Sequence, residues 1–272
     1  MTATIPGVDL ASFQGLPGTW RPEAGAIRWA GVKITELEPN GNRYVNPDAE
    51  ADWVNLKAQG DGRVAYLFGH PATSPAAAVD FFAAELAALG LEDSDAVALD
   101  HEESDGIGPA QVAGWGVQVT TMLRRRYARR PAVYTFIDYA LEGYCAGLGH
   151  HPLWISDPDS PAGSPRVPAP WKDWAMHQYD TSSPIDRDVA RYATQADMAA
   201  ALGRTGWQTW EADGTHSVMT LATATGAQAS TLLRMTVAHF GQFPDDLAHY
   251  LDRGDLSAMI PAKARIRVPR RP

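Results

Sequence analysis

The sequence predicts an α/β fold in which a parallel β/α barrel is followed by a small α+β unit. Short apolar runs alternate with helical patterns through the first two hundred residues, which is typical of parallel β/α architecture. The charge balance then changes after Gly203. Residues 205–272 hold seven Lys and Arg against six Asp and Glu, whereas the preceding residues hold 16 against 26. We therefore predict one domain at residues 1–204 and a second at residues 205–272.

Eight apolar runs in the first domain have the length and composition of buried strands. The predicted strands are residues 7–9, 27–35, 63–68, 96–100, 131–135, 152–156, 174–179 and 185–189. Asn46 is a suitable N-cap, with Pro47 at the first helical position. The predicted helices are residues 46–60, 74–90 and 109–126. The last strands follow one another through loops rather than clear helices, so an irregular barrel is expected.

The second domain carries helical patterns at Gln228–His239 and Pro244–Leu251, followed by an extended basic segment at Ala264–Pro269. With a strand before the helices, this order predicts a small βααβ unit.

Composition excludes several classes of protein. The net charge of −9 argues against nonspecific binding to nucleic acid. Apolar stretches stay shorter than the roughly 18 residues needed for a membrane span, so no membrane insertion is expected. The first residues lack the pattern of a secretory signal, which predicts synthesis in the cytoplasm. The single cysteine, Cys145, excludes an intramolecular disulfide and lies in an apolar context typical of a core residue.

Acidic residues stand where four of the predicted strands end. In a barrel of this kind, the active site forms at the carboxyl ends of the strands. One strand end could carry a surface salt bridge, but four acidic ends on one face favour a functional site. These acids are Asp9, Glu36, the pair Asp100 and Glu102, and, in the last strand, Asp186 and Asp188.

Asp100 and Glu102 point to the same face of an extended segment, roughly 7 Å apart at Cβ. His101 then points to the other face together with Glu103, which we treat as structural. Two carboxyls on one face suit glycoside cleavage: one with a raised pKa protonates the leaving oxygen, while the other stabilises positive charge. The pair could instead bind a divalent cation or form a structural ion-pair site.

Aromatic residues accompany these acids near the strand ends. Sugar rings have apolar faces that pack against aromatic planes, so this pattern favours a carbohydrate cleft. The alternative is that the aromatic rings only plug the barrel. The residues are Tyr66, Phe68, Tyr134, Trp154 and Tyr179.

Five segments, in order and spacing, resemble glycoside hydrolase family 25, the Chalaropsis-type lysozymes that are common among phage endolysins. They are Gly7–Gln14, Val32–Glu36, Ala98–Glu102, Pro152–Ile155, and His177–Tyr179 with the following Ile185 and Asp186. The resemblance covers about residues 5–195 and implies a (β/α)5(β)3 barrel. It also implies cleavage of the β-1,4 bond between N-acetylmuramic acid and N-acetylglucosamine in peptidoglycan, without a metal or other cofactor.

Carried over residue by residue, the resemblance makes Glu102 the general acid. Asp100 would stabilise the intermediate, by holding the acetamido group of the substrate if that group is the nucleophile. Asp9 and Asp186 would orient substrate or water and keep Glu102 protonated by like-charge repulsion. The cleft would be lined by Glu36, Tyr66 and the other aromatic residues named above, together with Gln178.

Two positions depart from the family pattern. Residues 33–37 read Lys-Ile-Thr-Glu-Leu where the family has Lys-Ala-Thr-Glu-Gly, so the glycine turn after Glu36 is lost. The last strand has acids at both Asp186 and Asp188 where the family has an Asp followed by an Asn two residues later. Asp188 is therefore a rival to Asp186.

The second domain resembles a LysM peptidoglycan-binding module at Ser217–Gly226, Leu232–Thr236 and Ile266–Pro269, although the usual Gly-Asp-Thr-Leu turn is missing. A helical wall-binding or dimerising domain is the alternative. The whole chain is thus predicted to be an endolysin that acts on the bacterial cell wall. Two other functions stay open: a related barrel hydrolase that cleaves chitin-like polymers, and a non-catalytic carbohydrate-binding virion protein.

Overall fold

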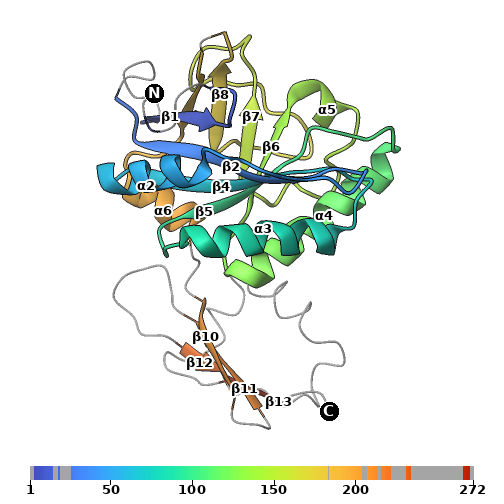
Figure 1. The fold of residues 1–272 in the computed structure, drawn as a ribbon, viewed down its shortest axis with the longest axis vertical. Coiled ribbons are helices and arrows are strands. Elements are labelled where there is room, and N and C mark those ends of the chain that lie inside the picture. The colour runs from blue at the N-terminus through green and yellow to red at the C-terminus, as the bar shows by residue number, and fades with distance from the viewer. Residues whose placement is uncertain are drawn as a thin grey trace. The chain divides into compact units, whose positions relative to one another are not determined.

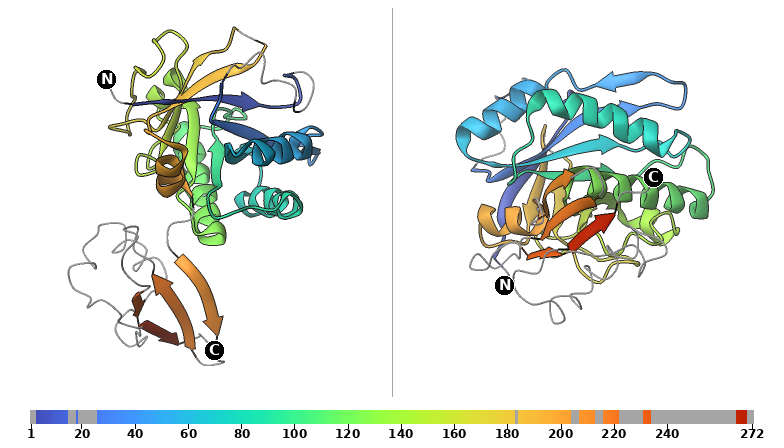
Figure 2. Two further views of the ribbon diagram at one scale, coloured as in Figure 1. Left: turned by 90° about the vertical axis from the view of Figure 1, so that its left-hand side faces the viewer. Right: turned by 90° about the horizontal axis from the view of Figure 1, so that it is seen from below.

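A computed structural model of the chain describes residues 3–14, 18, 26–182 and 184–203, together with four strands between residues 207 and 269. The chain divides into two compact units, Met1–Arg204 and Thr205–Pro272. The first unit contains the barrel and is seen from two further sides in Figure 2.

Within the described residues, eight strands close into a barrel (Figure 1). Apart from the short β3, strands that follow one another in sequence pair in parallel from β1 to β8. The last strand runs antiparallel between β8 and β1. The strands are β1 (Ile5–Leu10), β2 (Trp29–Leu37), β4 (Gly62–Phe68), β5 (Ala96–Asp100), β6 (Ala132–Phe136), β7 (Leu153–Ser156), β8 (Met176–Asp180) and β9 (Asp186–Ala190). All eight predicted strands, and the irregular barrel, are confirmed.

Three long helices cover the outside of the barrel, at the positions predicted: α2 (Ala49–Gln59), α3 (Pro75–Leu89) and α4 (Pro109–Tyr127). Ser74 caps α3 by accepting a hydrogen bond from the amide of Ala77 at 3.4 Å. The predicted cap of α2 is wrong, because the N-cap is Asp48. Asn46 instead accepts the amide of Asp48 through its side chain, which makes a turn that leads into the helix.

Three short elements were not predicted. β3 (Arg43–Val45) pairs antiparallel with the end of β2. α5 (Ile137–Leu141) follows β6 directly, and α6 (Gln195–Leu202) follows β9. The N-cap of α6 is Thr194, whose hydroxyl accepts the amide of Asp197 at 3.1 Å. These two residues are a capping signal that the sequence does contain.

Large rings fill the barrel interior, so it is a packed core rather than a pore. The indole rings of Trp29 and Trp154 meet edge to face, with centroids 5.6 Å apart. Glycines face these rings: a Cβ on Gly31 would lie 2.2 Å from Trp154, and one on Gly7 would lie 2.1 Å from Trp29. This layer forms a floor beneath the carboxyl ends of the strands. Its buried residues also include Ile5, Val64, Tyr66, Ala96, Ala98, Ala132, Met176 and Ala190.

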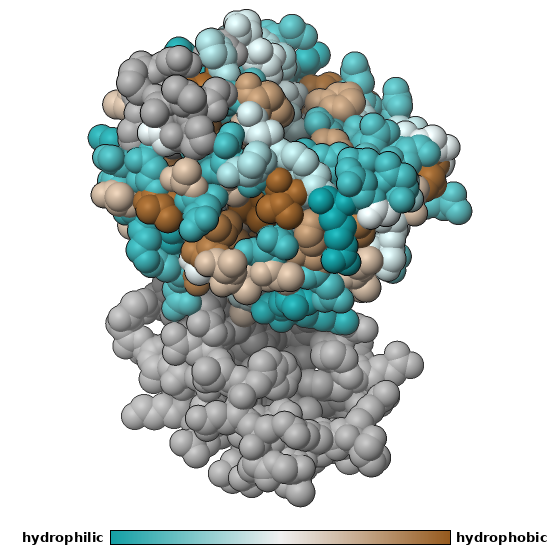
Figure 3. Space-filling view, viewed as in Figure 1, coloured by the Kyte–Doolittle hydropathy of each residue, from teal (hydrophilic) through white to brown (hydrophobic). Residues whose placement is uncertain are grey.

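A second, larger core lies between the outer face of the strands and the helices α2, α3 and α4. Figure 3 shows one face of the first unit, on which hydrophobic side chains gather near the centre among hydrophilic ones. Cys145 is buried in a third cluster beside Thr135, as predicted for a core residue. Among the described residues, the helices are all too short or too polar to cross a membrane.

The second unit is described only as four antiparallel strands, with β11 paired to each of the other three. The helix predicted at Gln228–His239 is wrong for residues 231–233, which form a strand. The rest of that pattern, and the helix predicted at Pro244–Leu251, lie outside the described residues. The extended segment near the end of the chain is confirmed at β13. The strands are β10 (Trp207–Ala212), β11 (His216–Leu221), β12 (Thr231–Leu233) and β13 (Ile266–Pro269).

Candidate active site

The predicted acids gather at the end of the barrel where the parallel strands finish. Strand register places them at one level: Asp9 pairs with Asp186 across β1 and β9, and Asp100 pairs with Tyr134 across β5 and β6. Because β9 runs in the opposite direction, its first residue rather than its last lies at this mouth. The sequence therefore brings Asp9, Asp100, Glu102 and Asp186 to one end of the barrel.

Asp100 ends β5 and is buried, whereas Glu102 lies two residues further on and is partly exposed. His101 points to the outside, where its Nε2 lies 3.1 Å from the carbonyl oxygen of Tyr144 and its ring stacks on Trp115. The carboxylate of Glu103 accepts the backbone amides of the next two residues at 2.8 and 2.9 Å. The alternation along this segment is the one expected, with Asp100 and Glu102 facing the site.

Burial and crowding shift the pKa values of Asp100, Glu102 and Asp9 upward. Burial raises the pKa of Asp100 well above its ordinary value, and the nearby charges of Glu102 and Asp9 add to this. Burial raises the pKa of Glu102 to about 6; Lys33 opposes the shift, while Glu103 and Asp186 support it. Burial also raises the pKa of Asp9 to about 7, against the lowering effect of the Tyr66 hydroxyl. These three acids therefore keep their protons to higher pH than ordinary carboxyl groups do.

Asp186 and Asp188 occupy different depths. Asp186 is partly exposed at the mouth, where its Oδ2 accepts a hydrogen bond from the side chain of Gln14 at 3.2 Å. Asp188 is fully buried one layer deeper and accepts the indole N–H of Trp154 at 2.7 Å. Asp186 thus shares the level of Asp9, while Asp188 holds the aromatic floor in place.

Lys33 is a site residue that the sequence analysis missed. It pairs with Tyr66 across β2 and β4 and therefore faces the barrel interior. Its ammonium lies 2.6 Å from Glu36 and 4.4 Å from the centroid of the Phe68 ring. Its charge makes the pKa values of Asp9, Asp100 and Glu102 lower than burial alone would make them. Lys33 thus places positive charge next to the group of acids.

A β-bulge places Glu36 on the same face as Lys33. Residues three apart in a regular strand point to opposite faces. The β2–β4 register shifts between Lys33 and Thr35, so that Lys33 pairs with Tyr66 and Glu36 with Phe68. Burial alone would raise the pKa of Glu36, but hydrogen bonds from Lys33 and His70 lower it overall. Glu36 is therefore an ionised acid at the rim of the mouth.

Gln178 connects residues from three strands beneath the mouth. Its side-chain oxygen accepts hydrogen bonds from the hydroxyls of Tyr134 and Ser156, both at 2.8 Å. Its side-chain nitrogen donates to Asp9 at 3.4 Å. Because Gln178 is buried, this arrangement fixes the orientation of Tyr134 and Asp9.

The predicted aromatic residues do not all reach the mouth. Phe68 and Tyr134 are partly exposed there, whereas Tyr66 is buried just below. Trp154 is 1% exposed and belongs to the floor, which differs from the predicted sugar contact. Tyr179 is partly exposed at the register shift between Gln178 and Asp180, and its ring contacts His177. For Trp154, the depth of the residue decides its place.

Among the described residues, no three His, Cys, Asp or Glu side chains are arranged to hold a metal ion.

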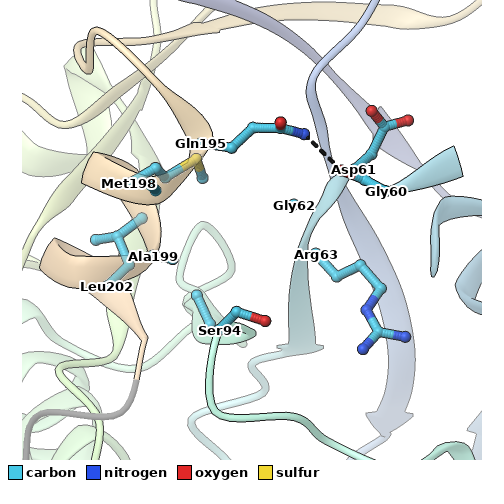
Figure 4. A pocket seen from close by; sticks show the side chains of 11 residues that line it. Gly60, Asp61, Gly62, Arg63, Ser94, Gln195, Met198, Ala199 and Leu202 are labelled. Atoms are coloured by element: carbon cyan, nitrogen blue, oxygen red, sulfur yellow. Dashed lines mark hydrogen bonds between the residues drawn. The ribbon is translucent and has the colours of Figure 1, made fainter.

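A cavity of about 180 Å³ lies at the opposite end of the barrel, between α6 and the first residues of β4 (Figure 4). Gln195 reaches across it and donates hydrogen bonds to the carbonyl oxygens of Arg28 and Gly60 at 2.6 and 2.9 Å. Arg63 beside it forms a buried two-pronged ion pair with Asp95. The paired acids are at the other end, so this cavity is not the candidate active site.

Comparison with known families matches this barrel over nearly its whole length. Residues 8–189, more than half of the chain, match the family described as "Glycosyl hydrolases family 25". The chain belongs to this family. It is therefore a glycoside hydrolase, and the acids at the barrel mouth lie within the matched region. No curated protein sequence matches the chain significantly.

Solved structures share the barrel of this family 25 chain. The bacterial lysozyme of Streptomyces coelicolor aligns with a TM-score of 0.62 at 22% identity, over 74% of this chain and 98% of that one. A family 25 lysozyme of Aspergillus fumigatus aligns with a TM-score of 0.61 at 18% identity, over 74% and 100% of the two chains. A muramidase of Acremonium alcalophilum aligns with a TM-score of 0.58 at 24% identity, over 68% and 92%. At these identities the likeness establishes the fold.

Proposed function

We propose that residues 1–204 form a muramidase that hydrolyses the β-1,4 bond between N-acetylmuramic acid and N-acetylglucosamine in bacterial peptidoglycan. Membership of family 25 supports glycoside hydrolysis, and the related structures include proteins named lysozymes and muramidases. The observation that carries the proposal is the pair Asp100 and Glu102, both with raised pKa values, at the mouth of the barrel.

Glu102 is the proposed general acid. A carboxylic acid donates its proton to a leaving glycosidic oxygen most effectively when its pKa lies near the working pH. Burial raises the pKa of Glu102 to about 6, so the proton is present in mildly acidic solution. Partial exposure leaves the carboxyl accessible to a sugar chain in the mouth.

Asp100 is the proposed partner of the acetamido group of the substrate. Its Oδ1 is buried and has no hydrogen-bond partner among the described residues. A buried acceptor of this kind is satisfied by the N–H of an N-acetyl group, and a neutral carboxyl still accepts through its carbonyl oxygen. Held in this way, the acetamido oxygen is the nucleophile, in substrate-assisted cleavage. The new sugar end then keeps the β configuration.

Asp9 and Asp186 are the proposed flanking acids. The charge of Asp186 raises the pKa of both Glu102 and Asp9, which favours the protonated general acid. The accessible position of Asp186 at the mouth supports it over Asp188 as the acid that orients water or substrate. Glu36, Tyr66, Phe68, Tyr134 and Gln178 are the proposed lining of the cleft.

The deciding experiment measures the release of reducing ends from purified peptidoglycan by wild type and by Glu102→Gln. We expect a loss of about a hundredfold or more in the variant, with folding retained. Glu50→Gln, which changes an exposed acid on α2, is the matched control and should keep full activity. Wild-type protein that binds cell walls but releases no reducing ends would refute the proposal. Mass spectrometry of the products separates muramidase activity, which leaves a reducing N-acetylmuramic acid, from cleavage of chitin-like polymers.

We also propose that residues 205–272 hold the enzyme on the cell wall, in the manner of a LysM-like module. The barrel unit carries the excess of acidic residues, and it gains nothing from charge attraction to an anionic wall. The second unit is nearly neutral, which suits retention on that surface. A catalytic unit followed by a retention unit supports an endolysin of phage type.

A further inference from the structure

His70 links three segments around the proposed active site. It follows β4, and both of its ring nitrogens face carboxylate oxygens. Nε2 lies 2.9 Å from Oε1 of Glu36 at the end of β2. Nδ1 lies 2.7 Å from Oδ1 of Asp105, in the loop 101–108 that also carries Glu102. All three side chains are largely shielded, at 13%, 21% and 10% exposure for His70, Glu36 and Asp105.

Between two ionised carboxylates, this geometry requires the imidazolium form of His70. A neutral imidazole has one N–H and one lone pair, so one of its two nitrogens would face a carboxylate oxygen without a proton between them. Only the cation donates to both acids. Burial alone would lower the pKa of His70, but its hydrogen bonds to Asp105 and Glu36 raise it overall.

The imidazole ring of His70 is surrounded by charged and aromatic groups from β2, the loop 101–108 and β4. From β2, Glu36 faces the ring and Lys33 lies behind Glu36. From the loop 101–108, Asp105 faces the ring, and its own amide donates to Glu103 at 2.9 Å. From β4, the ring of Phe68 lies 5.2 Å away between centroids. The cation is therefore held between two acids, with a third acid and an ammonium one step further out.

The backbone on either side of His70 is fixed. Gly69 donates a hydrogen bond to the carbonyl oxygen of Asp100 at 2.9 Å, and a Cβ on Gly69 would clash with that oxygen. Asp105 accepts the amide of Ala72 through its second carboxylate oxygen at 2.9 Å. Asp105 itself has a left-handed backbone, with φ of 51°, that its contacts must maintain. His70 thus lies between two anchored segments: the turn after β4, which is bonded to Asp100, and the loop 101–108, which is bonded to Ala72.

We propose that His70 is a positioning residue: as an imidazolium it ties the loop carrying Glu102 to the end of β2 and keeps Lys33 and Glu36 in place beside the acids. Loss of its proton breaks one of the two bonds and loosens the loop. The tie itself does not depend on the reaction, whereas its effect on catalysis rests on the proposed muramidase activity.

The first test is an NMR titration of the full chain with labelled histidine, in which His70→Gln identifies the signal. We expect the His70 pKa to lie above the ordinary value for histidine, and Asp105→Asn to lower it. Asn tolerates the left-handed backbone at this position, so the variant removes the charge with little strain. A His70 pKa at or below the ordinary value, unchanged in Asp105→Asn, would overturn the proposal. This test stands even if no peptidoglycan is cleaved.

The second test is the pH profile of kcat/KM on soluble peptidoglycan fragments. In wild type, the alkaline fall should steepen from the loss of one proton, on Glu102, to the loss of two as His70 also deprotonates. His70→Gln should lower kcat/KM by roughly tenfold to a hundredfold, because a misplaced catalytic group is costly. His70→Arg keeps the charge and two donors, so it should restore most of the activity and follow the one-proton slope throughout.

His150→Gln, an exposed histidine on another part of the barrel, is the matched control and should leave the profile unchanged. If His70 were purely structural, His70→Gln would lower the activity by the same factor at every pH, and His70→Arg would keep the wild-type slope of the alkaline fall. That result would overturn the proposal. If His70→Gln fails to fold, the slope in His70→Arg and the titration of Asp105→Asn decide the matter.

Discussion

Asp9 lies directly opposite Asp186 in the antiparallel ladder between the first and last strands of the barrel. The pairing that closes the circle therefore also completes the group of acids. The charge of Asp186 raises the pKa of Glu102, which is carried by the middle of the chain, and the charges of Asp186 and Glu102 raise that of Asp9. The ladder that closes the barrel thus also places two of the acids at its mouth. Variants of the two acids in the last strand test which of them acts in the reaction.

Asp186→Asn should lower kcat on peptidoglycan by at least about tenfold, with little change in stability, because Asp186 is partly exposed at the mouth. Asp188→Ala should instead change kcat little and lower the stability of the fold. It leaves the buried indole N–H of Trp154 without its acceptor, which costs about 1–3 kcal/mol of unfolding free energy. Activity assays and thermal unfolding of both variants measure this. Greater loss of activity in Asp188→Asn than in Asp186→Asn, at equal stability, would reverse the assignment.

Activity should fall as the pH rises through about 6, the pKa of Glu102. The sign follows from the role: a general acid must hold its proton, so the rate is full below its pKa and is lost above it. Lys33→Met removes a cation that lowers this pKa, so the fall should move to higher pH. Lys57→Met, on α2, should leave the profile in place. A rate that increases between about pH 6 and 8 would contradict Glu102 as the acid.

The eight barrel strands could be predicted from the sequence because each is an apolar run bounded by turn residues. β3 could not, since Arg43, Tyr44 and Val45 are exposed or only partly buried and carry no apolar signal. The short α5 has a similar lack of signal. The acids at the mouth were also predictable, because the strand ends of a parallel barrel meet on one face.

Lys33 and the network around Glu36 could not be predicted from alternation. A regular strand would place these two residues on opposite faces, and only the bulge between Lys33 and Thr35 brings them together. The depth of Trp154 was equally hidden. An inward-facing aromatic residue near a strand end can line the mouth or fill the floor, and the choice depends on Gly31, which makes room for the ring.

Asp9→Asn should stabilise the protein near neutral pH while reducing its activity. Burial raises the pKa of Asp9 to about 7, above its value in the unfolded chain. Between these two values the native state holds a proton that the unfolded state has lost, so stability declines as the pH rises. The amide removes this penalty, which is on the order of 1–3 kcal/mol after allowance for solvent screening. Urea unfolding should show a gain at about pH 7 that vanishes near pH 4. An equal gain at both pH values would point to packing instead.

Removal of residues 205–272 should reduce lysis of intact cells by at least about tenfold, but leave the cleavage of soluble peptidoglycan fragments nearly unchanged. All barrel strands and α6 lie before this boundary, so the truncated chain keeps its complete core. Retention on an insoluble polymer increases the local concentration of the enzyme at its substrate, an effect that small soluble fragments do not report. Parallel assays on cells and on fragments measure the two effects, with binding to purified walls as a third reading. Equal loss on both substrates would show that the second unit supports the barrel rather than the wall contact.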